Sequence, residues 1–502
     1  MKKRNHNSSK YKRGGSTLEV LIAFAVLMIS ITTTIVVAFG NQSNSVDTET
    51  NNEALYKAQG LLEEARALSR ANFADVETAT STEMSGALLY DKELTVLDIS
   101  ECKKQATSPV MWATTTPRTQ KIELTTYLTS TDAFFALGGD CPLDAPEDGW
   151  NPPVVFADDT INPGDFSSLD VVNKIVYLGS DSDNANNQHF YIADARTATL
   201  GQSGGLMVAF TNSFNDDGET INEINDIDVF KDFATSKVYA FIAMASTTAQ
   251  FAVLDVTNIN NPELVAKRRL SGITGSGPTA WGWRIYYYDK KVYITAREVG
   301  GPELHVFDVS DPTSPSEVGS KQLNTTANDL VVRDGIGYFA TETDLRGELL
   351  VYNVSNPASI TEIAGAGWNF GGDEDGRSLF LLGNKLYFGR DKTSSGPEFY
   401  ILDASNPLTA VGGLPIFGGS DPNKEINANV TDIRVAGRFA FLASHSGGSR
   451  GFYVWDISNP TNIQSIYLDF NFGNKPIAID YEDNFVYAIG LSTPNLQILY
   501  SP

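Results

Sequence analysis

With 502 residues, the chain is longer than one ordinary domain, and 42% apolar residues are enough to build more than one core. The formal net charge is −24, although the first fourteen residues hold six Lys or Arg and no acid. The acidic remainder would repel nucleic acid, so a nucleic-acid-binding function is excluded for it.

The first element that the sequence predicts is an apolar helix. Residues 18–39 (LEVLIAFAVLMISITTTIVVAF) hold one charge, Glu19, and are long enough to span a bilayer. The basic residues before them would keep the N-terminus inside the cell. A secretory signal peptide would need a shorter apolar core and a better cleavage site than Ala38-Phe39-Gly40. A plain signal anchor gives no reason for a carboxylate at the membrane edge.

The sequence GGSTLE (14–19), followed by this apolar run, resembles the N-terminus of type IV prepilins in its minor-pilin and pseudopilin form. The resemblance implies a leader over residues 1–14, cleavage after Gly14 by a prepilin peptidase, and methylation of the new amino group on Gly15. It also implies that Glu19, the fifth mature residue, pairs with the N-terminus of a neighbouring subunit. Gly15 departs from the family pattern, in which Phe is commoner.

Helical spacing continues beyond the apolar run. Residues 15–70 are expected to form one transmembrane and assembly helix of about 84 Å. Residues 71–150 hold strand-like runs at 86–91, 93–99, 109–115 and 121–129. A long helix followed by such strands resembles a small α+β pilin-like head, and residues 142–153, rich in Pro and acids, are expected as a linker.

Both cysteines, Cys102 and Cys141, fall in this head region. Outside the cytoplasm such a pair usually forms a disulfide, and closing a loop of about 40 residues is worth roughly 4 kcal/mol. Two unpaired thiols are the alternative.

Residues 151–502 repeat themselves. A strand followed by a turn recurs as FAVLDVTNINNP, LHVFDVSDP, LLVYNVSNP, FYILDASNP and FYVWDISNP. Two strands joined by a tight turn precede each copy and another strand follows, so a unit is four strands in about 45 to 60 residues. About seven units predict an all-β propeller. The last unit lacks its outer strand, which Val154-Val155-Phe156-Ala157 could supply to close the ring.

The repeats resemble the LVIVD family, named for its apolar strand that ends in Asp, and the resemblance implies a β-propeller without naming a function. The acid or amide at each strand end is interpreted as turn chemistry, because its side chain can accept backbone N–H bonds and the following Pro fixes φ. These residues are Asp255, Asp308, Asn353, Asp403 and Asp456.

One face of the predicted propeller carries long and varied loops, namely the second-to-third-strand loops and the blade-to-blade connections. We expect this face to bind a partner. Aromatic residues and arginine dominate contact energies, and the alternative for the Trp residues is that they fill gaps between blades. The candidate binding residues are Trp281, Trp283, Trp368, Asp373 and Arg377.

Asp226, Asp329 and Asp432 open the innermost strands of the second, fourth and sixth units. They could ring the channel mouth and hold Ca²⁺, which prefers several oxygen ligands. Hydrogen-bonded turn residues are the alternative, and no other cofactor is expected.

No catalytic arrangement is evident in the sequence. His189, His305 and His445 stand alone in sequence. The segment 201–205 (GQSGG) matches a nucleophile elbow only literally, because a strand-like run follows it where an elbow needs a helix. We therefore expect no enzymatic activity.

These features predict a surface-displayed minor pilin-like subunit of a type IV pilus, with the propeller as an adhesive or partner-binding tip domain. The expected partners are the prepilin peptidase, other pilin subunits through the N-terminal helix, and a surface ligand or protein. The chain would cross the inner (cytoplasmic) membrane once before assembly, with its bulk outside. A pseudopilin that handles cargo in a type II secretion-like system is the alternative, and an anchored surface enzyme is a third possibility.

Overall fold

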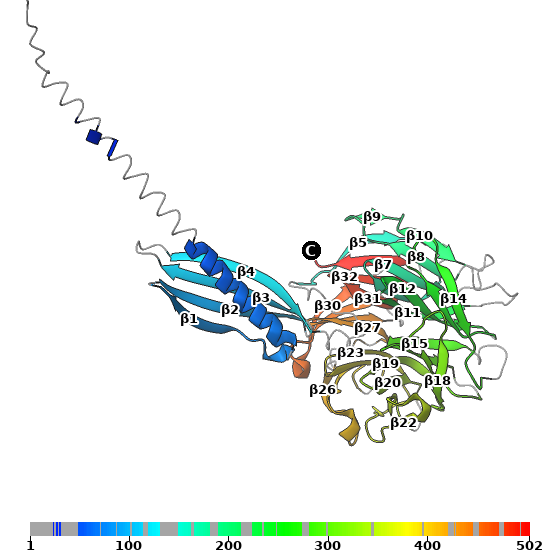
Figure 1. The fold of residues 1–502 in the computed structure, drawn as a ribbon. Coiled ribbons are helices and arrows are strands. Elements are labelled where there is room, and N and C mark those ends of the chain that lie inside the picture. The colour runs from blue at the N-terminus through cyan, green and yellow to red at the C-terminus, as the bar shows by residue number, and fades with distance from the viewer. Residues whose placement is uncertain are drawn as a thin grey trace, which may run out of the picture. The chain divides into compact units, whose positions relative to one another are not determined.

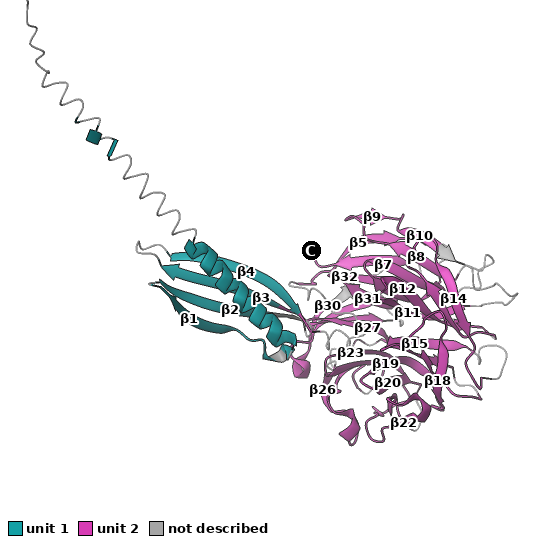
Figure 2. Ribbon diagram, viewed as in Figure 1, with its two compact units in different colours: residues 1–97, 105–128 teal, residues 98–104, 129–502 magenta. Residues whose placement is uncertain are grey.

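The computed structural model describes residues 24, 27–28, 30–31, 49–70, 72–86, 88–100, 103–113, 119–130, 149–161, 165–180, 189–211, 223–232, 235–246, 248–273, 281–297, 300–342, 346–393, 396–419, 426, 428–444, 451–470, 476–491 and 493–502. The chain divides into two compact units (Figure 2). We call residues 1–97 and 105–128 the head unit, and residues 98–104 and 129–502 the propeller unit.

Most of the predicted leader and apolar helix lies outside the described residues, as do Gly14, Gly15, Glu19, Cys102 and Cys141. Within the described ranges, no helix is both long enough and apolar enough to cross a membrane. The described residues of the apolar segment are helical, and the four apolar ones have exposed side chains. These four are Phe24, Leu27, Met28 and Ile31.

In the head unit, a helix over residues 49–70 packs on a four-stranded sheet (Figure 1). Its buried residues recur at helical spacing, as an amphipathic helix requires: Ala54, Ala58, Leu62 and Ala65. They join sheet residues such as Tyr90, Val110 and Leu128 in two small cores. After η1 (Phe73–Asp75), the sheet order is β1 (Ala79–Ser85), β2 (Leu88–Ser100), β3 (Lys103–Ala113) and β4 (Thr119–Thr129).

The head sheet differs from the prediction in two places. The runs 86–91 and 93–99 belong almost entirely to one continuous strand, β2. The strand β1 was not predicted, because its sequence ATSTEMS has a single large apolar side chain, Met84, which is 64% exposed. Pairing with β2 from Ala79↔Leu94 to Ser85↔Leu88 forms this strand despite its polar composition.

The propeller unit consists of six four-stranded antiparallel sheets and a seventh sheet of four antiparallel strands that a short fifth strand extends, which confirms the predicted propeller-like all-β body. The first is β6 (Phe166–Val172), β7 (Ile175–Ser180), β8 (Phe190–Asp194) and β10 (Met207–Thr211). The second is β11 (Glu223–Asp232), β12 (Lys237–Ala245), β13 (Phe251–Asp255) and β14 (Glu263–Arg268). The third is β15 (Gly282–Tyr288), β16 (Lys291–Ala296), β17 (Leu304–Asp308) and β18 (Ser316–Lys321).

The next three sheets repeat this order of strands. The fourth is β19 (Ala327–Arg333), β20 (Ile336–Thr341), β21 (Leu349–Asn353) and β22 (Thr361–Glu362). The fifth is β23 (Gly376–Leu382), β24 (Lys385–Arg390), β25 (Phe399–Asp403) and β26 (Ile416–Gly419). The sixth is β27 (Val430–Ala436), β28 (Phe439–Ser444), β29 (Phe452–Asp456) and β30 (Gln464–Phe470). The short helices η4 (Pro357–Ser359), η5 (Pro407–Thr409) and η6 (Pro460–Asn462) follow the third strands of these sheets.

The seventh sheet closes the ring. It contains β31 (Pro476–Glu482), β32 (Phe485–Gly490), β33 (Leu496–Tyr500) and β5 (Val154–Asp159), and β9 (Gln202–Ser203) extends it. The strand β5 pairs antiparallel with β33, as Ala157↔Ile498, so the predicted closure by Val154–Ala157 is confirmed. Each innermost strand also lies next to the innermost strand of the following sheet, and β31 lies next to β6.

Trp150, which the sequence analysis placed in a linker, is fully buried in the core of the propeller unit. Its indole meets the ring of Phe441 edge-on, with the centroids 4.6 Å apart. The backbone N–H of Trp150 donates to Ser501 Oγ at 3.1 Å. The propeller unit therefore includes a residue before the expected boundary at 151, since an aromatic side chain this deeply buried belongs to the core that it fills.

The predicted turn chemistry at the ends of the third strands is confirmed. In five sheets the side-chain oxygen of the last strand residue accepts a hydrogen bond from the backbone N–H two residues later. The N···O distances are 3.0 Å for Asp255, 2.8 Å for Asp308, 3.1 Å for Asn353, 2.9 Å for Asp403 and 2.9 Å for Asp456. These residues are part of the scaffold.

Two glycines allow neighbouring sheets to approach closely. A Cβ on Gly319 would lie 1.8 Å from the carbonyl oxygen of Pro357, and a Cβ on Gly418 would lie 1.6 Å from that of Pro460. The two prolines begin η4 and η6, so a fourth strand packs against the turn of the next sheet at each place. Glycine is needed there because any side chain would meet backbone.

Candidate binding cavity

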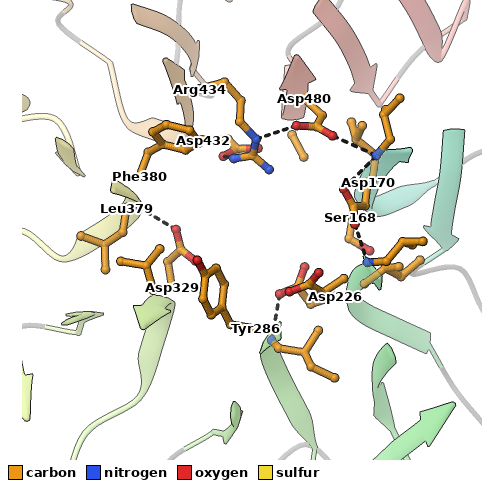
Figure 3. Close-up of a pocket in the computed structure, with 18 of the residues that line it drawn as sticks. Ser168, Asp170, Asp226, Tyr286, Asp329, Leu379, Phe380, Asp432, Arg434 and Asp480 are labelled. Atoms are coloured by element: carbon orange, nitrogen blue, oxygen red, sulfur yellow. Dashed lines mark hydrogen bonds and ion pairs between the residues drawn. The ribbon is translucent and has the colours of Figure 1, made fainter. Parts of the chain in front are cut away.

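The seven innermost strands surround a cavity of about 1000 Å³ (Figure 3). Each of these strands has a register shift near its start, which turns two alternate side chains toward the cavity and the next sheet. We define an upper layer nearer the strand starts, made by Ser168, Asp226, Arg284, Asp329, Asp432 and Ala478. We define a lower layer, made by Asp170, Asp228, Tyr286, Val331, Phe380, Arg434 and Asp480.

The cavity carboxylates join neighbouring sheets. In the upper layer, Asp226 Oδ2 accepts the backbone N–H of Ile285 on the next innermost strand at 3.0 Å. Asp329 accepts that of Leu379 at 2.7 Å and Asp432 that of Ile479 at 2.9 Å. In the lower layer, Asp228 accepts from Tyr287 at 2.6 Å and Asp480 from Val171 at 2.8 Å, and Asp170 accepts from Val229. Six Asp residues thus each form a hydrogen bond that links one sheet of the ring to the next.

This geometry gives Asp226, Asp329 and Asp432 a role that the sequence analysis did not weigh. They lie within strands, not in turns, and each accepts a backbone hydrogen bond from the next sheet. Among the described residues, no three His, Cys, Asp or Glu side chains are grouped so that they could hold a metal ion.

Arg434 partly offsets the negative charge of the cavity. It bonds Asp432 Oδ1 at 2.8 Å through Nη1 and Asp480 Oδ1 at 2.9 Å through Nε, and its side chain is 24% exposed. Burial lowers the pKa of Arg434, but the two carboxylates outweigh burial and raise it overall. The guanidinium is therefore charged and links the sixth and seventh sheets.

Burial makes the cavity carboxyls harder to ionise and raises the pKa even of Asp432, despite its ion pair with Arg434. Burial raises the pKa of Asp228 to about 7, with the charge of Asp226 adding to the effect. Burial also raises the pKa of Asp170 well above its usual range, with Asp480 nearby. For Asp329, burial raises the pKa to about 7 although Arg284 opposes the shift. These groups hold protons at pH values where exposed carboxyls have lost them.

The raised pKa of Asp329 predicts that the propeller unit loses stability as pH increases. The ordinary pKa of Asp is about 4, so the folded state binds this proton more tightly than the unfolded state, and the gain is lost as pH rises through about 7. We expect a lower melting temperature at about pH 8 than at about pH 5, and a difference in unfolding free energy of about 2 kcal/mol from this group. Asp329→Asn should reduce the pH 5 to pH 8 difference in thermal unfolding monitored by circular dichroism.

A matched control is Asp255→Asn. Burial raises the pKa of Asp255, but hydrogen bonds from Thr257 and Lys237 outweigh burial and lower it overall, so this carboxylate stays ionised over the tested range. Asn occupies the same turn position naturally at Asn353. The pH dependence of Asp255→Asn should match that of the wild type, and an equally flat profile for both variants would contradict the assignment to Asp329.

Two of the five predicted binding residues, Trp283 and Arg377, line the cavity. They lie near the starts of β15 and β23, at the end of the cavity where blade-to-blade connections enter. The guanidinium carbons of Arg284 and Arg297 lie 5.1 Å and 4.4 Å from the Trp283 ring centroid, as in cation–π contacts. Arg377 forms a bidentate ion pair with Asp391, at 2.7 Å and 2.6 Å.

The other three predicted residues are not brought to the cavity. Trp281 is half-buried, and its carbonyl accepts the backbone N–H of Arg297 at 3.4 Å. Trp368 packs against the core of the fourth and fifth sheets and donates from Nε1 to the Leu414 carbonyl at 2.6 Å, so it is the gap-filling residue that was the alternative interpretation. Asp373 is exposed.

Parts of several long loops predicted for this face, at 180–188, 271–283 and 418–432, lie outside the described residues, namely 181–188, 274–280, 420–425 and 427. The segment 201–205 contains β9, which pairs in parallel with β5. Ser203 Oγ donates to Asp158 Oδ1 at 2.6 Å, and a strand, β10, follows the segment. The local geometry is a glycine-rich turn at a sheet edge, with positive φ at Gly201, Gly204 and Gly205.

A family model described as the LVIVD repeat matches residues 293–322 and 428–466. The first match covers β16 to β18, and the second covers the sixth sheet. The chain is therefore an all-β, β-propeller-like protein that carries LVIVD repeats. No curated protein matches it.

Several solved structures are similar to the chain. They include the computationally designed protein Ika8, with 13% identity over 69% of this chain and 99% of that chain and a TM-score of 0.43. A chain of the mitotic checkpoint complex has 10% identity over 72% of this chain and 96% of that chain, with a TM-score of 0.44. A candidate 6-phosphogluconolactonase from Bacteroides fragilis has 11% identity over 81% of this chain and 97% of that chain, also with a TM-score of 0.44. These values carry no argument about function.

Proposed function

We propose that the chain is a minor pilin-like subunit of a type IV pilus, displayed at the cell surface, with the propeller unit as its adhesive or partner-binding domain. The observation that carries the proposal is the order of parts along the chain. The GGSTLE segment and its apolar run are followed directly by a helix that packs on a four-stranded sheet. This is the arrangement expected of a pilin-like head, and the propeller follows as an addition.

The exposed apolar residues of the N-terminal segment support the same proposal. Phe24, Leu27, Met28 and Ile31 are 47–61% exposed, whereas the helix over residues 49–70 buries its apolar stripe. An apolar helical surface of this kind needs membrane or neighbouring helices to cover it. In the proposed function, the membrane covers it before assembly and the helices of other pilin subunits cover it in the filament.

The size of the propeller unit indicates that each filament holds few copies of this subunit. It includes residues 129–502, which would crowd a helical shaft if every subunit carried them. We therefore place the protein at the pilus tip. A pseudopilin that handles cargo in a type II secretion-like system remains the second candidate, because the same N-terminal motif serves both assemblies.

Immunogold labelling of sheared filaments tests the proposal. An antibody to the propeller unit should label filament tips, because a bulky, rare subunit fits there. Label confined to the cell envelope would favour the pseudopilin, and label absent from both filaments and envelope would reject both candidates. A strain that lacks the gene is the control for specificity.

A further inference from the structure

The lower layer of the cavity is asymmetric. Its acids Asp480, Asp170 and Asp228 come from the seventh, first and second sheets, which are consecutive in the ring. On the opposite side, the third and fifth sheets contribute Tyr286 and Phe380 (Figure 3). The fourth sheet, between them in the ring, contributes Val331. A carboxyl wall thus faces an aromatic and aliphatic wall. A ligand that fits between them needs hydrogen-bonding groups on one side and an apolar face on the other.

At the upper end of the cavity, a side-chain hydrogen bond between neighbouring innermost strands recurs in some sheets and is missing in others. Near the starts of four innermost strands, a polar side chain donates to a backbone carbonyl of the next innermost strand, and in the fifth sheet Ser378 Oγ donates to Val430 O at 2.9 Å. Asn225 Nδ2 donates to Gly282 O at 2.7 Å, Asn328 Nδ2 donates to Gly376 O at 2.8 Å, and Ser167 Oγ donates to Ile224 O. The register shifts place Trp283 and Thr431 at the corresponding positions of the third and sixth sheets.

These two residues leave polar atoms without partners. Trp283 Nε1 and Thr431 Oγ1 are buried atoms of cavity-lining residues, and neither has a hydrogen-bond partner among the described residues. Burying such a group unpaired is unfavourable, so native proteins seldom retain one without a reason. Because the two atoms have almost no accessible surface, a ligand would bond them by drawing the two side chains toward the cavity.

The arginines that line the cavity are already paired. Arg434 bonds two carboxylates, and Arg377 bonds Asp391 on both of its edges. Arg284 donates from Nε to Asn328 O at 2.6 Å and from Nη1 to Asn225 O at 3.2 Å. An anionic ligand would have to displace one of these contacts. Since burial also raises the pKa of Asp228 to about 7, the acid wall offers a hydroxyl ligand both donors and acceptors.

We propose that this cavity binds a neutral saccharide. Its hydroxyls would bond Trp283 Nε1, Thr431 Oγ1 and the carboxyl wall, and its C–H face would pack on Tyr286 and Phe380. A cavity of about 1000 Å³ has room for more than one sugar ring. The inference rests on the proposed role of the propeller unit as the binding domain, and it names the ligand class.

The test uses the full chain in detergent and an immobilised panel of oligosaccharides. The panel holds neutral glycans ending in mannose, galactose or N-acetylglucosamine, and sialylated glycans for comparison. Thr431→Val removes an unpartnered hydroxyl with little change of shape, so its melting temperature should not fall. Trp283→Phe keeps an aromatic ring and removes the indole N–H. We expect at least one neutral glycan to bind, and each variant to weaken that binding about tenfold or more.

Trp368→Phe is the matched control. Its Nε1 is satisfied by Leu414 O and its ring packs within the core, so this variant should lower the melting temperature and leave the binding constant unchanged. The inference is overturned if no neutral glycan binds, if only sialylated glycans bind, or if both Thr431→Val and Trp283→Phe bind as the wild type does.

The outcome is independent of pilus assembly, because the binding assay needs no filament. Neutral-glycan binding with the expected loss in both variants, but without tip labelling, would reject the pilin role and leave this inference standing. Tip labelling without neutral-glycan binding would reject this inference and leave the pilin role standing.

Discussion

Glu19→Ala is expected to keep the chain out of filaments while the chain is still made and inserted. The resemblance to prepilins implies that this carboxylate pairs with the N-terminal amine of a neighbouring subunit. In an apolar surrounding, an unpaired amine is strongly unfavourable, so removing the acid should abolish incorporation. Sheared filaments and membranes from cells that express the variant would be compared by immunoblotting, and the signal should remain in the membrane fraction only.

The control for this prediction is Glu64→Ala. Glu64 lies on the helix over residues 49–70 and is exposed, so its removal should leave assembly unchanged. Normal filament incorporation of Glu19→Ala would contradict the pilin account of the N-terminus. Failure of both variants to assemble would also contradict it, since the effect would then not be specific to the residue at the fifth mature position.

Deletion of residues 154–159 is expected to remove the cooperative folding of the propeller unit. These residues form β5, which supplies the outer strand of the seventh sheet and brings the buried Ala157 into the core. Without β5, the edge of β33 is unpaired and apolar surface is exposed. We expect the deleted chain to melt at least about 10 °C lower, or to aggregate. Differential scanning calorimetry of the full chain in detergent would measure the change.

A substitution at a highly exposed residue is the control for nonspecific destabilisation. Val411 is 93% exposed, so Val411→Asp should leave the melting temperature within about 2 °C of the wild type. If the deletion of β5 also left the transition intact, closure by this strand would not contribute to stability, and the ring would be held by contacts between the innermost strands alone.

Most of the propeller could be predicted from the sequence because its signals are local. The repeated strand with its Asp or Asn turn marks five of the seven sheets, and the missing outer strand of the last repeat indicated where closure must come from. Trp150 was misplaced because a single aromatic residue among prolines and acids shows no periodicity. Its burial depends on Phe441, far away in sequence.

The candidate cavity was only partly predictable. Asp226, Asp329 and Asp432 were placed near the channel from their position at the strand starts, and their role in joining sheets was missed. The lower-layer residues Asp170 and Asp480 were not singled out at all. Their spacing could have indicated them. Asp170 and Asp480 each come two residues after an upper-layer residue, and side chains two residues apart on a strand lie on the same face. Only the register shifts show that this face of the strand points toward the cavity.

The closing strand also fixes when the propeller unit can be completed. Asn495 bonds both the N–H and the carbonyl of Ile161, across 334 residues of sequence, and β33 pairs with β5 beside them. A chain that is made and exported from its N-terminus therefore carries the edge of β5 that pairs with β33 open until the last repeat has followed it. Contacts of such high sequence separation form slowly and leave strand edges open meanwhile. In the proposed function, the ring would therefore close only on the far side of the membrane, once the whole unit has crossed.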